Sequence, residues 1–267
     1  MRLFDSHAHL GAPELRGEAG AMLERARDAG VRGVVAVGAG YGLSLNAAAV
    51  ALAEEHADVW ATAGLHPHDA EQWNELAERA IDGWLSHGRV LAVGECGLDY
   101  WYQHAPRERQ EACLRGQIAL ARHHELPLVI HVRPSRGARD AFTDLLRIFD
   151  EAGADRAGGV IHCFTGDLHF ARECLARGFD ISFSGIITFK TAAALRDVAA
   201  ALPLERLLIE TDTPLLAPDP HRGRRNEPAF VGRVAECLAE LHETDADAIG
   251  QCTEARARQA FRIESVA

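Results

Sequence analysis

Eight short apolar runs, most of them followed by a stretch of helical periodicity, constrain the fold of this chain more than any other feature. Most of the runs are rich in Val, Ile and Leu without polar interruption, which is typical of parallel strands buried on both faces. They occupy residues 3–4, 33–37, 59–64, 90–94, 128–131, 159–162, 180–183 and 207–210. This alternation predicts a (β/α)8 TIM barrel, with a doubly wound open sheet as the alternative.

The stretches between the runs predict helices with recognisable ends. Apolar periodicity predicts helices over 18–29, 44–56, 71–87 and 107–125, and Pro106 is a suitable residue just before the last of these. A further helix over 245–263 is expected to pack outside the barrel. No linker, repeat or low-complexity tract divides the 267 residues, so we expect one domain over residues 1–267.

Charge and cysteine usage narrow the class of protein. The 28 Lys and Arg residues against 39 Asp and Glu give a net charge of −11, which argues against coating of duplex DNA by bulk electrostatics. A nucleic-acid enzyme is still possible, because a metal site supplies local positive charge. Six scattered cysteines without a CxxC pair, no leader, and no apolar run near the roughly 20 residues of a membrane span predict a cytoplasmic protein.

Titratable side chains recur where the predicted strands end. In a TIM barrel these ends form the active-site face, so we expect the side chains to converge there. His7 and His9 are two residues apart and point to the same side of an extended chain, which suits them to bind one divalent ion. An HxH pair alone is also common among surface histidines, but further strand ends supply more donors. The candidate metal ligands are His7, His9, Glu95, His131, His162 and Asp212.

Other residues near the same ends are candidates for supporting roles. His66 and His68 either contact phosphate or the metal ligands, or only shape the turn between them. Arg133 could grip a phosphate oxygen with its planar guanidinium or form a salt bridge at the rim. Glu210 could orient a histidine ligand or form an ion pair inside the barrel. The basic loop 222–228 could support a nucleic-acid backbone or be a solvated run of charge.

Nine segments together resemble the TatD family of metal-dependent deoxyribonucleases, within the amidohydrolase-like barrels. The segments are FDSHAHL, GLHPH, VGECGLDYW, PRERQ, LVIHVR, HCFTG, FSGIITFK, LLIETDTPLLAP and RGRRNEPAFV. They run from end to end of the chain in the family's order and are more specific together than any single motif. Cys96 and residues 101–104 depart from the family pattern, which affects fine substrate preference and leaves the metal ligands in place.

The resemblance implies a binuclear metal site. It assigns His7, His9 and Asp212 to one metal, His131 and His162 to the other, and Glu95 to a bridge between them. Two cations held about 3.5–4 Å apart lower the pKa of a shared water and contact a phosphoryl group. Glu95 and Asp212 are therefore the expected catalytic residues, with Asp212 as general base. Lys190, in the segment FSGIITFK, is a further candidate contact to a substrate phosphate.

The implied function is a divalent-metal-dependent DNA exonuclease that acts on single-stranded ends. The alternative of a small ester, lactone or amide hydrolase is disfavoured, because many such enzymes bridge their metals with a carbamylated lysine where this chain has Glu95, and its only lysine is Lys190. A non-catalytic metal-binding scaffold would have a depleted ligand set, and no ligand position is substituted. The two ions could be Mg²⁺, Zn²⁺, Mn²⁺ or Fe²⁺. We expect a DNA substrate, no membrane association and an undetermined oligomeric state, with a monomer favoured.

Overall fold

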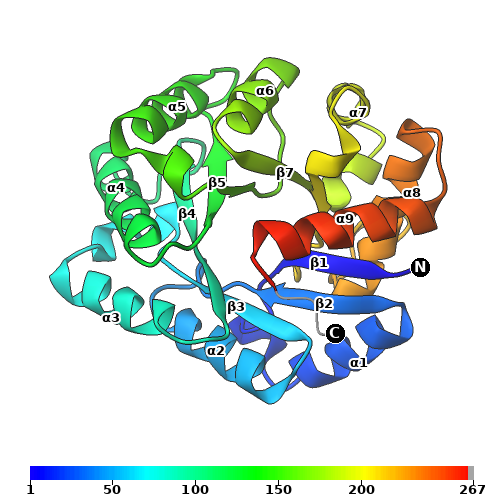
Figure 1. The fold of residues 1–267 in the computed structure, drawn as a ribbon, viewed down its shortest axis with the longest axis horizontal. Coiled ribbons are helices and arrows are strands. Elements are labelled where there is room, and N and C mark those ends of the chain that lie inside the picture. The colour runs from blue at the N-terminus through cyan, green and yellow to red at the C-terminus, as the bar shows by residue number, and fades with distance from the viewer. Residues whose placement is uncertain (264–267) are drawn as a thin grey trace.

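The computed structural model describes residues 1–263, and in these the chain forms a ring of eight parallel strands surrounded by helices (Figure 1). The order of the strands in the sheet follows their order in the chain, and a bridge between Ala8 and Thr213 brings the two ends of the sheet together. This confirms the predicted (β/α)8 TIM barrel over the open sheet. The strands are β1 (Leu3–Ala8), β2 (Val31–Ala36), β3 (Val59–Ala63), β4 (Val90–Asp99), β5 (Leu128–Arg133), β6 (Gly159–Ile161), β7 (Phe179–Phe183) and β8 (Leu207–Ile209).

The helices begin and end close to the predicted positions, with one exception. The third was expected from residue 71, but it begins at Glu75, because the Asn74 side chain caps it by accepting the N–H groups of Leu76 and Ala77. The residues before it form a short 3-10 helix. The α-helices are α1 (Ala19–Asp28), α2 (Leu45–Glu55), α3 (Glu75–Leu85), α4 (Arg107–His123), α5 (Asp140–Ala152), α6 (Leu168–Ala176), α7 (Ala193–Ala200), α8 (Gly232–Leu241) and α9 (Ala246–Ala260). The 3-10 helices are η1 (Pro13–Leu15), η2 (Pro67–Gln72), η3 (Ala154–Arg156), η4 (Gly185–Thr188), η5 (Leu204–Arg206) and η6 (Pro228–Val231).

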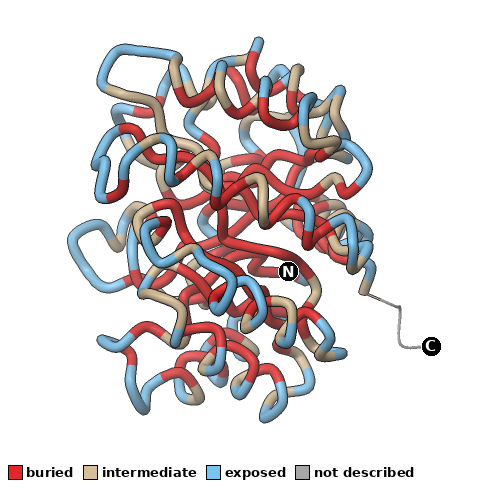
Figure 2. Tube along the Cα trace, turned by 90° about the vertical axis from the view of Figure 1, so that its left-hand side faces the viewer, coloured by how far each residue is buried: buried red, intermediate tan, exposed pale blue. Residues whose placement is uncertain are grey.

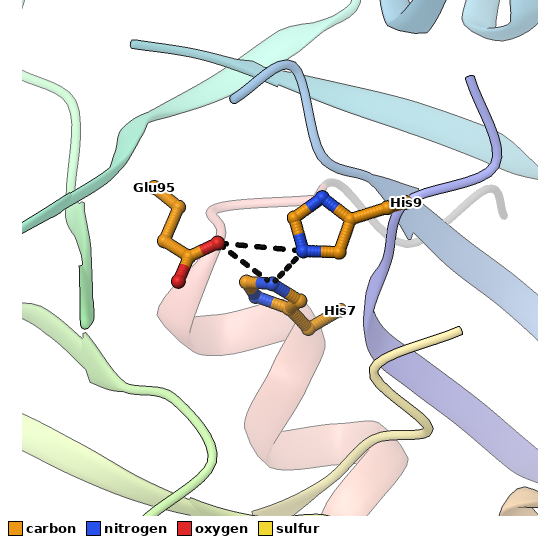
Figure 3. Close-up of side chains that lie close together, drawn as sticks. All are labelled: His7, His9 and Glu95. Atoms are coloured by element: carbon orange, nitrogen blue, oxygen red, sulfur yellow. Dashed lines mark hydrogen bonds and ion pairs between the residues drawn. The ribbon is translucent and has the colours of Figure 1, made fainter. Parts of the chain in front are cut away.

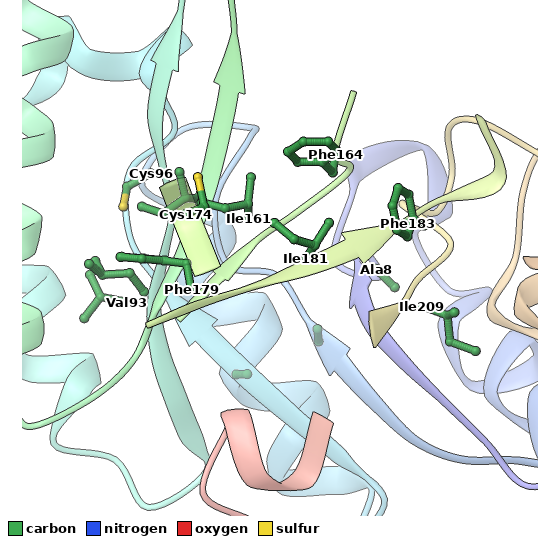
Figure 4. Close-up of a cluster of buried hydrophobic side chains, with 14 of the residues drawn as sticks. Ala8, Val93, Cys96, Ile161, Phe164, Cys174, Phe179, Ile181, Phe183 and Ile209 are labelled. Carbon is green, nitrogen blue, oxygen red and sulfur yellow. The ribbon is translucent and has the colours of Figure 1, made fainter. Parts of the chain in front are cut away.

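The core has two layers, because successive strand residues point to opposite faces of the sheet. The outer layer lies between strands and helices, and buried segments run through the middle of the molecule in Figure 2. Figure 4 shows part of the layer, where the Phe164 and Phe183 rings meet edge to face with centroids 6.1 Å apart. The inner layer fills the barrel and includes Phe4, Val129 and Leu208. The strands therefore have apolar neighbours on both faces, as their continuous apolar sequences predict.

Helix α9 covers the end of the barrel where the strands begin. Asp245 caps its first turn by accepting the N–H of Ala248, and the helix packs on β1 and β8 (Figure 1). Ala257 and Phe261 join the inner apolar layer and contact the cluster around Phe4. The predicted C-terminal helix is thus present, but it closes the barrel interior instead of adding to the outer ring.

Two predictions about the environment of the chain can be compared with the structure. No helix in residues 1–263 is both long and apolar enough to span a membrane. All six cysteines have free thiols in this structure.

We expect Phe261→Ala to lower the free energy of unfolding by about 3 kcal/mol, because Phe261 is buried and its loss leaves a cavity. Urea denaturation measures the change. Leu76→Ala, at an exposed apolar side chain of α3, is the control and should change stability by less than about 0.5 kcal/mol. The metal content of the Phe261 variant should be normal, since α9 lies at the opposite end from the metal-ligand candidates. A destabilisation no larger than that of the control would contradict the view that Phe261 helps to close the barrel interior.

Candidate metal centre

Glu95 lies at the centre of a buried group of imidazoles and carboxylates at the C-terminal end of the barrel. Its two carboxylate oxygens face different histidines. Oε2 lies 3.4 Å from Nε2 of His7 and 3.4 Å from Nε2 of His9, and the three side chains point toward one another in Figure 3. Oε1 lies 2.9 Å from Nε2 of His162 and 3.0 Å from Nδ1 of His131. One carboxylate thus contacts two separate sets of possible ligands.

The first set is completed by Asp212, which follows β8. Its Oδ1 lies 3.4 Å from Nε2 of His9 and 3.8 Å from Nε2 of His7, and the two Nε2 atoms are 3.2 Å apart. An ion with tetrahedral bonds of about 2.1 Å separates its ligand atoms by about 3.4 Å. The donor atoms of this set therefore already have the spacing of ligands that share one ion.

The second set includes a histidine that the sequence did not place among the ligands. His66, after β3, has its Nε2 3.4 Å from Oε1 of Glu95 and belongs to a donor group with Glu95 and His131. His162 connects the two sets, because its ring stacks on that of His7 with centroids 3.7 Å apart. The Nδ1 atom of His66 also accepts the N–H of His68 at 3.1 Å, so the side chain shapes the turn as well as facing Glu95.

Three of the histidines are oriented by a partner on the far side of the ring. His9 donates from Nδ1 to the Ala39 carbonyl at 2.9 Å, and Nδ1 of His162 lies 3.0 Å from Oε1 of Glu210. His131 contacts Oδ2 of Asp99 with Nε2 at 3.1 Å. In each case the other ring nitrogen faces Glu95, which is the arrangement that fixes the tautomer and rotation of metal-binding histidines.

Asp99 was not among the residues singled out in the sequence. Its Oδ2 contacts Nε2 of His68 at 3.0 Å as well as His131. It ends β4 four residues after Glu95, and an even spacing on a strand places two side chains on the same face. That signal was present, but the strand was expected to end at residue 94. Asp99 thereby holds His68 beside the donor groups.

Local backbone features allow the strand ends to come this close. Gly97 has φ 144° in β4, and a Cβ there would lie 1.9 Å from the carbonyl oxygen of His131. Only glycine leaves room for β5 at this point. Asp212 has φ 60° and Cys163 has φ 44°, in the left-handed region that non-glycine residues seldom adopt. Unusual conformations of this kind concentrate at functional sites.

The electrostatics of the group favour bound cations. Burial would raise the pKa of Glu95, but the charge of His162 and hydrogen bonds from His131 and His162 hold that pKa well below its usual value. Burial lowers the pKa of His66 to about 4, which leaves a neutral ring that can act as a ligand. Burial would also lower the pKa of His9, but hydrogen bonds to Asp212 and Glu95 raise it to about 9. The ionised carboxylates thus attract positive charge, as protons or as metal ions.

A cavity of about 640 Å³ opens above the group and makes it accessible. Arg133 is in its wall and forms no ion pair with any residue that the structure describes. Lys190 is exposed and is not part of the wall. The structure therefore brings Arg133 to the candidate centre together with the histidines, and leaves Lys190 outside it. The wall contains His9, His66, His68, Glu95, Asp99, His131, His162 and Asp212.

The chemistry of the donor groups fits divalent metal ions. Neutral imidazole and carboxylate oxygen are the ligands that Zn²⁺, Mn²⁺ and Fe²⁺ accept in proteins, and carboxylates also suit Mg²⁺. Three groups of donors at this end of the barrel have ligand atoms close enough to share an ion, and Glu95 belongs to two of them. Each group is largely buried, so a bound ion would be held by the protein and not only by solvent.

Comparisons with known proteins agree with this chemistry. The chain matches the family described as "TatD related DNase" over residues 4–262. It is 41% identical over 261 residues to the uncharacterized metal-dependent hydrolase YabD of Bacillus subtilis, covering 98% of this chain and 99% of that protein. It is 37% identical over 267 residues to the 3'-5' ssDNA/RNA exonuclease TatD of Edwardsiella piscicida, covering 98% and 100%. The crystal structure of YJJV, a TatD homolog from Escherichia coli, aligns with a TM-score of 0.89 at 32% identity and covers 98% of this chain and 99% of its own.

We expect Glu210→Gln to weaken divalent metal binding about 10- to 100-fold, because Glu210 orients His162 and increases its basicity through Nδ1. Calorimetric titration with Mn²⁺ or Zn²⁺ measures the affinity. Glu24→Gln, at an exposed carboxylate of α1, is the matched control and should bind the metal as the wild type does. Equal affinity in the Glu210 variant and the control would show that this contact does not support a ligand.

Proposed function

The chain belongs to the TatD family of DNases, and from this membership and its candidate metal centre we propose that it is a divalent-metal-dependent exonuclease acting on single-stranded DNA ends. The observation that carries the proposal is the position of Glu95, whose two oxygens face two sets of donors. A carboxylate in that position suits a bridge between two ions. The alternative of a small-molecule ester or amide hydrolase has no observation in its favour.

We assign the ligands as the family resemblance implies. His7, His9 and Asp212 would hold one ion, His131 and His162 the other, and Glu95 both, although His162 also lies close enough to His7 and Asp212 to share an ion with them. His66, which also faces Glu95, would be an additional ligand of the second ion. When bound there, divalent ions would polarise the phosphodiester and lower the pKa of the attacking water.

Asp212 is the proposed general base. Burial would raise its pKa, but the hydrogen bond from His9 and the charges of His162 and other imidazoles lower it, so the carboxylate is ionised and accepts a proton. Glu210, Asp99 and the Ala39 carbonyl keep the histidines in place while the proton moves. Because these contacts are made before substrate arrives, little reorganisation is needed during the reaction.

A single-stranded end is the substrate that the shape of the site favours. Side-chain exposure is 3% for Glu95 and 10% for Asp212, so a phosphodiester must enter the cavity to reach them. A flexible strand end could enter such a cavity more readily than a stiff duplex. Arg133 would contact a phosphate inside the cavity, His66 and His68 would line its path, and exposed Lys190 would contact a phosphate further along the strand. We further propose that the protein is a cytoplasmic monomer, and the free thiols support the location.

The deciding experiment compares wild type, Glu95→Gln and the control Glu24→Gln on end-labelled single-stranded DNA, beside a panel of small esters and lactones. Wild type and control should contain about two ions per chain and shorten the DNA from one end. Glu95→Gln should lose one ion and about 10³-fold in hydrolysis, a change of about 4 kcal/mol, because one neutral amide replaces the carboxylate that both sets of ligands face. Two ions and near-normal turnover in this variant would refute the bridge. Hydrolysis of esters without hydrolysis of DNA would refute the nuclease.

Arg133→Met should weaken DNA binding, because the variant removes a cation from the cavity and leaves the metal-ligand candidates unchanged. We expect KM for single-stranded DNA to rise about tenfold. The slope of log K for DNA binding, plotted against log[salt], should become less steep by about 0.7, which is the amount for one phosphate contact on a single strand. Lys190→Met should flatten it by a similar amount with a smaller change in KM. An unaltered salt dependence in both variants would mean that neither residue contacts phosphate.

A further inference from the structure

Large exposed apolar side chains gather around the mouth of the metal cavity. The described residues contain six such side chains. Three of them line the metal cavity, and a fourth, Trp101, lines the cavity next to it. Trp101 and Tyr102 are 45% and 53% exposed, although aromatic rings of this size are usually covered. An exposed apolar patch beside a cavity is typical of a surface that binds a ligand. The four are Tyr41, Trp101, Tyr102 and Leu215.

The rings of Trp101 and Tyr102 both lie next to the guanidinium of Arg133, which is in the cavity wall. The guanidinium carbon of Arg133 lies 5.0 Å from the ring centroid of Trp101 and 4.9 Å from that of Tyr102. Both distances are in the range of cation–π contacts, which hold the guanidinium without using its hydrogen-bond donors. Arg133 can therefore keep its place between the rings while its N–H groups bind an anion.

A second cavity, of about 480 Å³, lies on the other side of Arg133. It shares Arg133 and Thr165 with the metal cavity, so the two are neighbours. Trp101, Phe142 and Leu195 provide part of its wall. Its volume is within the range of about 300–1,000 Å³ that small-molecule sites occupy. A flat apolar group bound there would be adjacent to a phosphate bound at the metal centre.

The turn that carries the aromatic rings is attached to the metal-binding residues. Oδ1 of Asp99 accepts the backbone N–H groups of Trp101 at 3.0 Å and Tyr102 at 2.8 Å. Oδ2 of the same carboxylate contacts His131. One side chain thus fixes the distance between the rings and a candidate metal ligand, as a substrate spanning both requires.

We propose that Trp101, Tyr102, Arg133 and the second cavity form a nucleobase subsite, which stacks an unpaired base next to the phosphodiester bond at the metal centre. The inference rests on the proposed nuclease function. Aromatic faces beside an arginine are the combination that binds unpaired bases, and such stacking tolerates any base because every base has a π-face. The subsite would favour strands over phosphodiesters without bases, and single strands over duplexes, whose bases are already stacked.

The test compares a single-stranded oligothymidylate with an oligomer of the same length made of abasic nucleotides, a phosphodiester chain that carries no aromatic ring. The measured quantity is the ratio of kcat/KM for the two substrates in metal-loaded protein. Trp101→Ala should lower this ratio at least tenfold, mainly through KM for the oligothymidylate, and Trp101→Phe should restore most of it. Leu76→Ala, an exposed apolar side chain away from the cavities, is the matched control and should leave the ratio unchanged. A ratio within twofold of wild type in Trp101→Ala overturns the subsite.

A second measurement locates the stacked base. One abasic nucleotide is moved through the last positions of the oligonucleotide, and kcat/KM is measured for wild type and Trp101→Ala. Wild type should lose activity at one position, and the variant should lose nothing further there, because both changes remove the same contact. An equal penalty in both proteins overturns the subsite.

The two proposals fail in different ways. If wild type hydrolyses DNA but the ratio and the abasic penalty are unaltered in Trp101→Ala, only the subsite is refuted. If wild type does not hydrolyse DNA, the nuclease proposal is refuted, and fluorescence anisotropy with the labelled oligonucleotide then decides the subsite. Weaker binding by Trp101→Ala than by Leu76→Ala supports it, and equal binding overturns it.

Discussion

A buried, ionised carboxylate is the constraint on which the rest of this site depends. Removing the charge of Glu95 from water costs several kcal/mol unless partners compensate it, and the chain provides imidazoles on both of its oxygens. Those imidazoles need partners of their own, which Asp99, Glu210 and a backbone carbonyl supply. The rim therefore consists of linked polar contacts in which each ligand candidate is oriented before any ion or substrate binds.

The barrel separates this polar rim from the contacts that stabilise the fold. At one end of the strands, Phe261 and the residues around it exclude water from the barrel interior. At the other, charged groups and left-handed backbone at Cys163 and Asp212 are tolerated because the packed strands hold them in place. This division lets the strand ends carry strained and charged residues, while continuous apolar strands supply the core.

Periodicity and strand-end positions predicted the barrel and the residues gathered around Glu95, because both follow from local patterns along the chain. Asp99 was missed because β4 continues five residues past its apolar run, held there by pairing with β5 that the sequence of β4 alone does not reveal. The position of Lys190 relative to the cavity could not be predicted from local sequence patterns either. Its distance from the cavity depends on how the segment after β7 folds over the rim, and this is decided by tertiary packing.

The charge of the site implies that metal and substrate binding are coupled. Glu95, Asp99, Glu210 and Asp212 are all buried near the cavity, in a chain whose net charge is −11. Without metal ions, protonated His9 and His162 offset part of this negative charge, and Arg133 adds one further cation. Divalent ions bound to these residues would replace the protons with a larger positive charge, so they would make the cavity more attractive to the phosphate. By linkage the phosphate must then increase the affinity of the site for the ions by the same factor. In the proposed nuclease, Arg133 and the aromatic rings would contact the strand without competing for the ions, because none of them is a metal-ligand candidate.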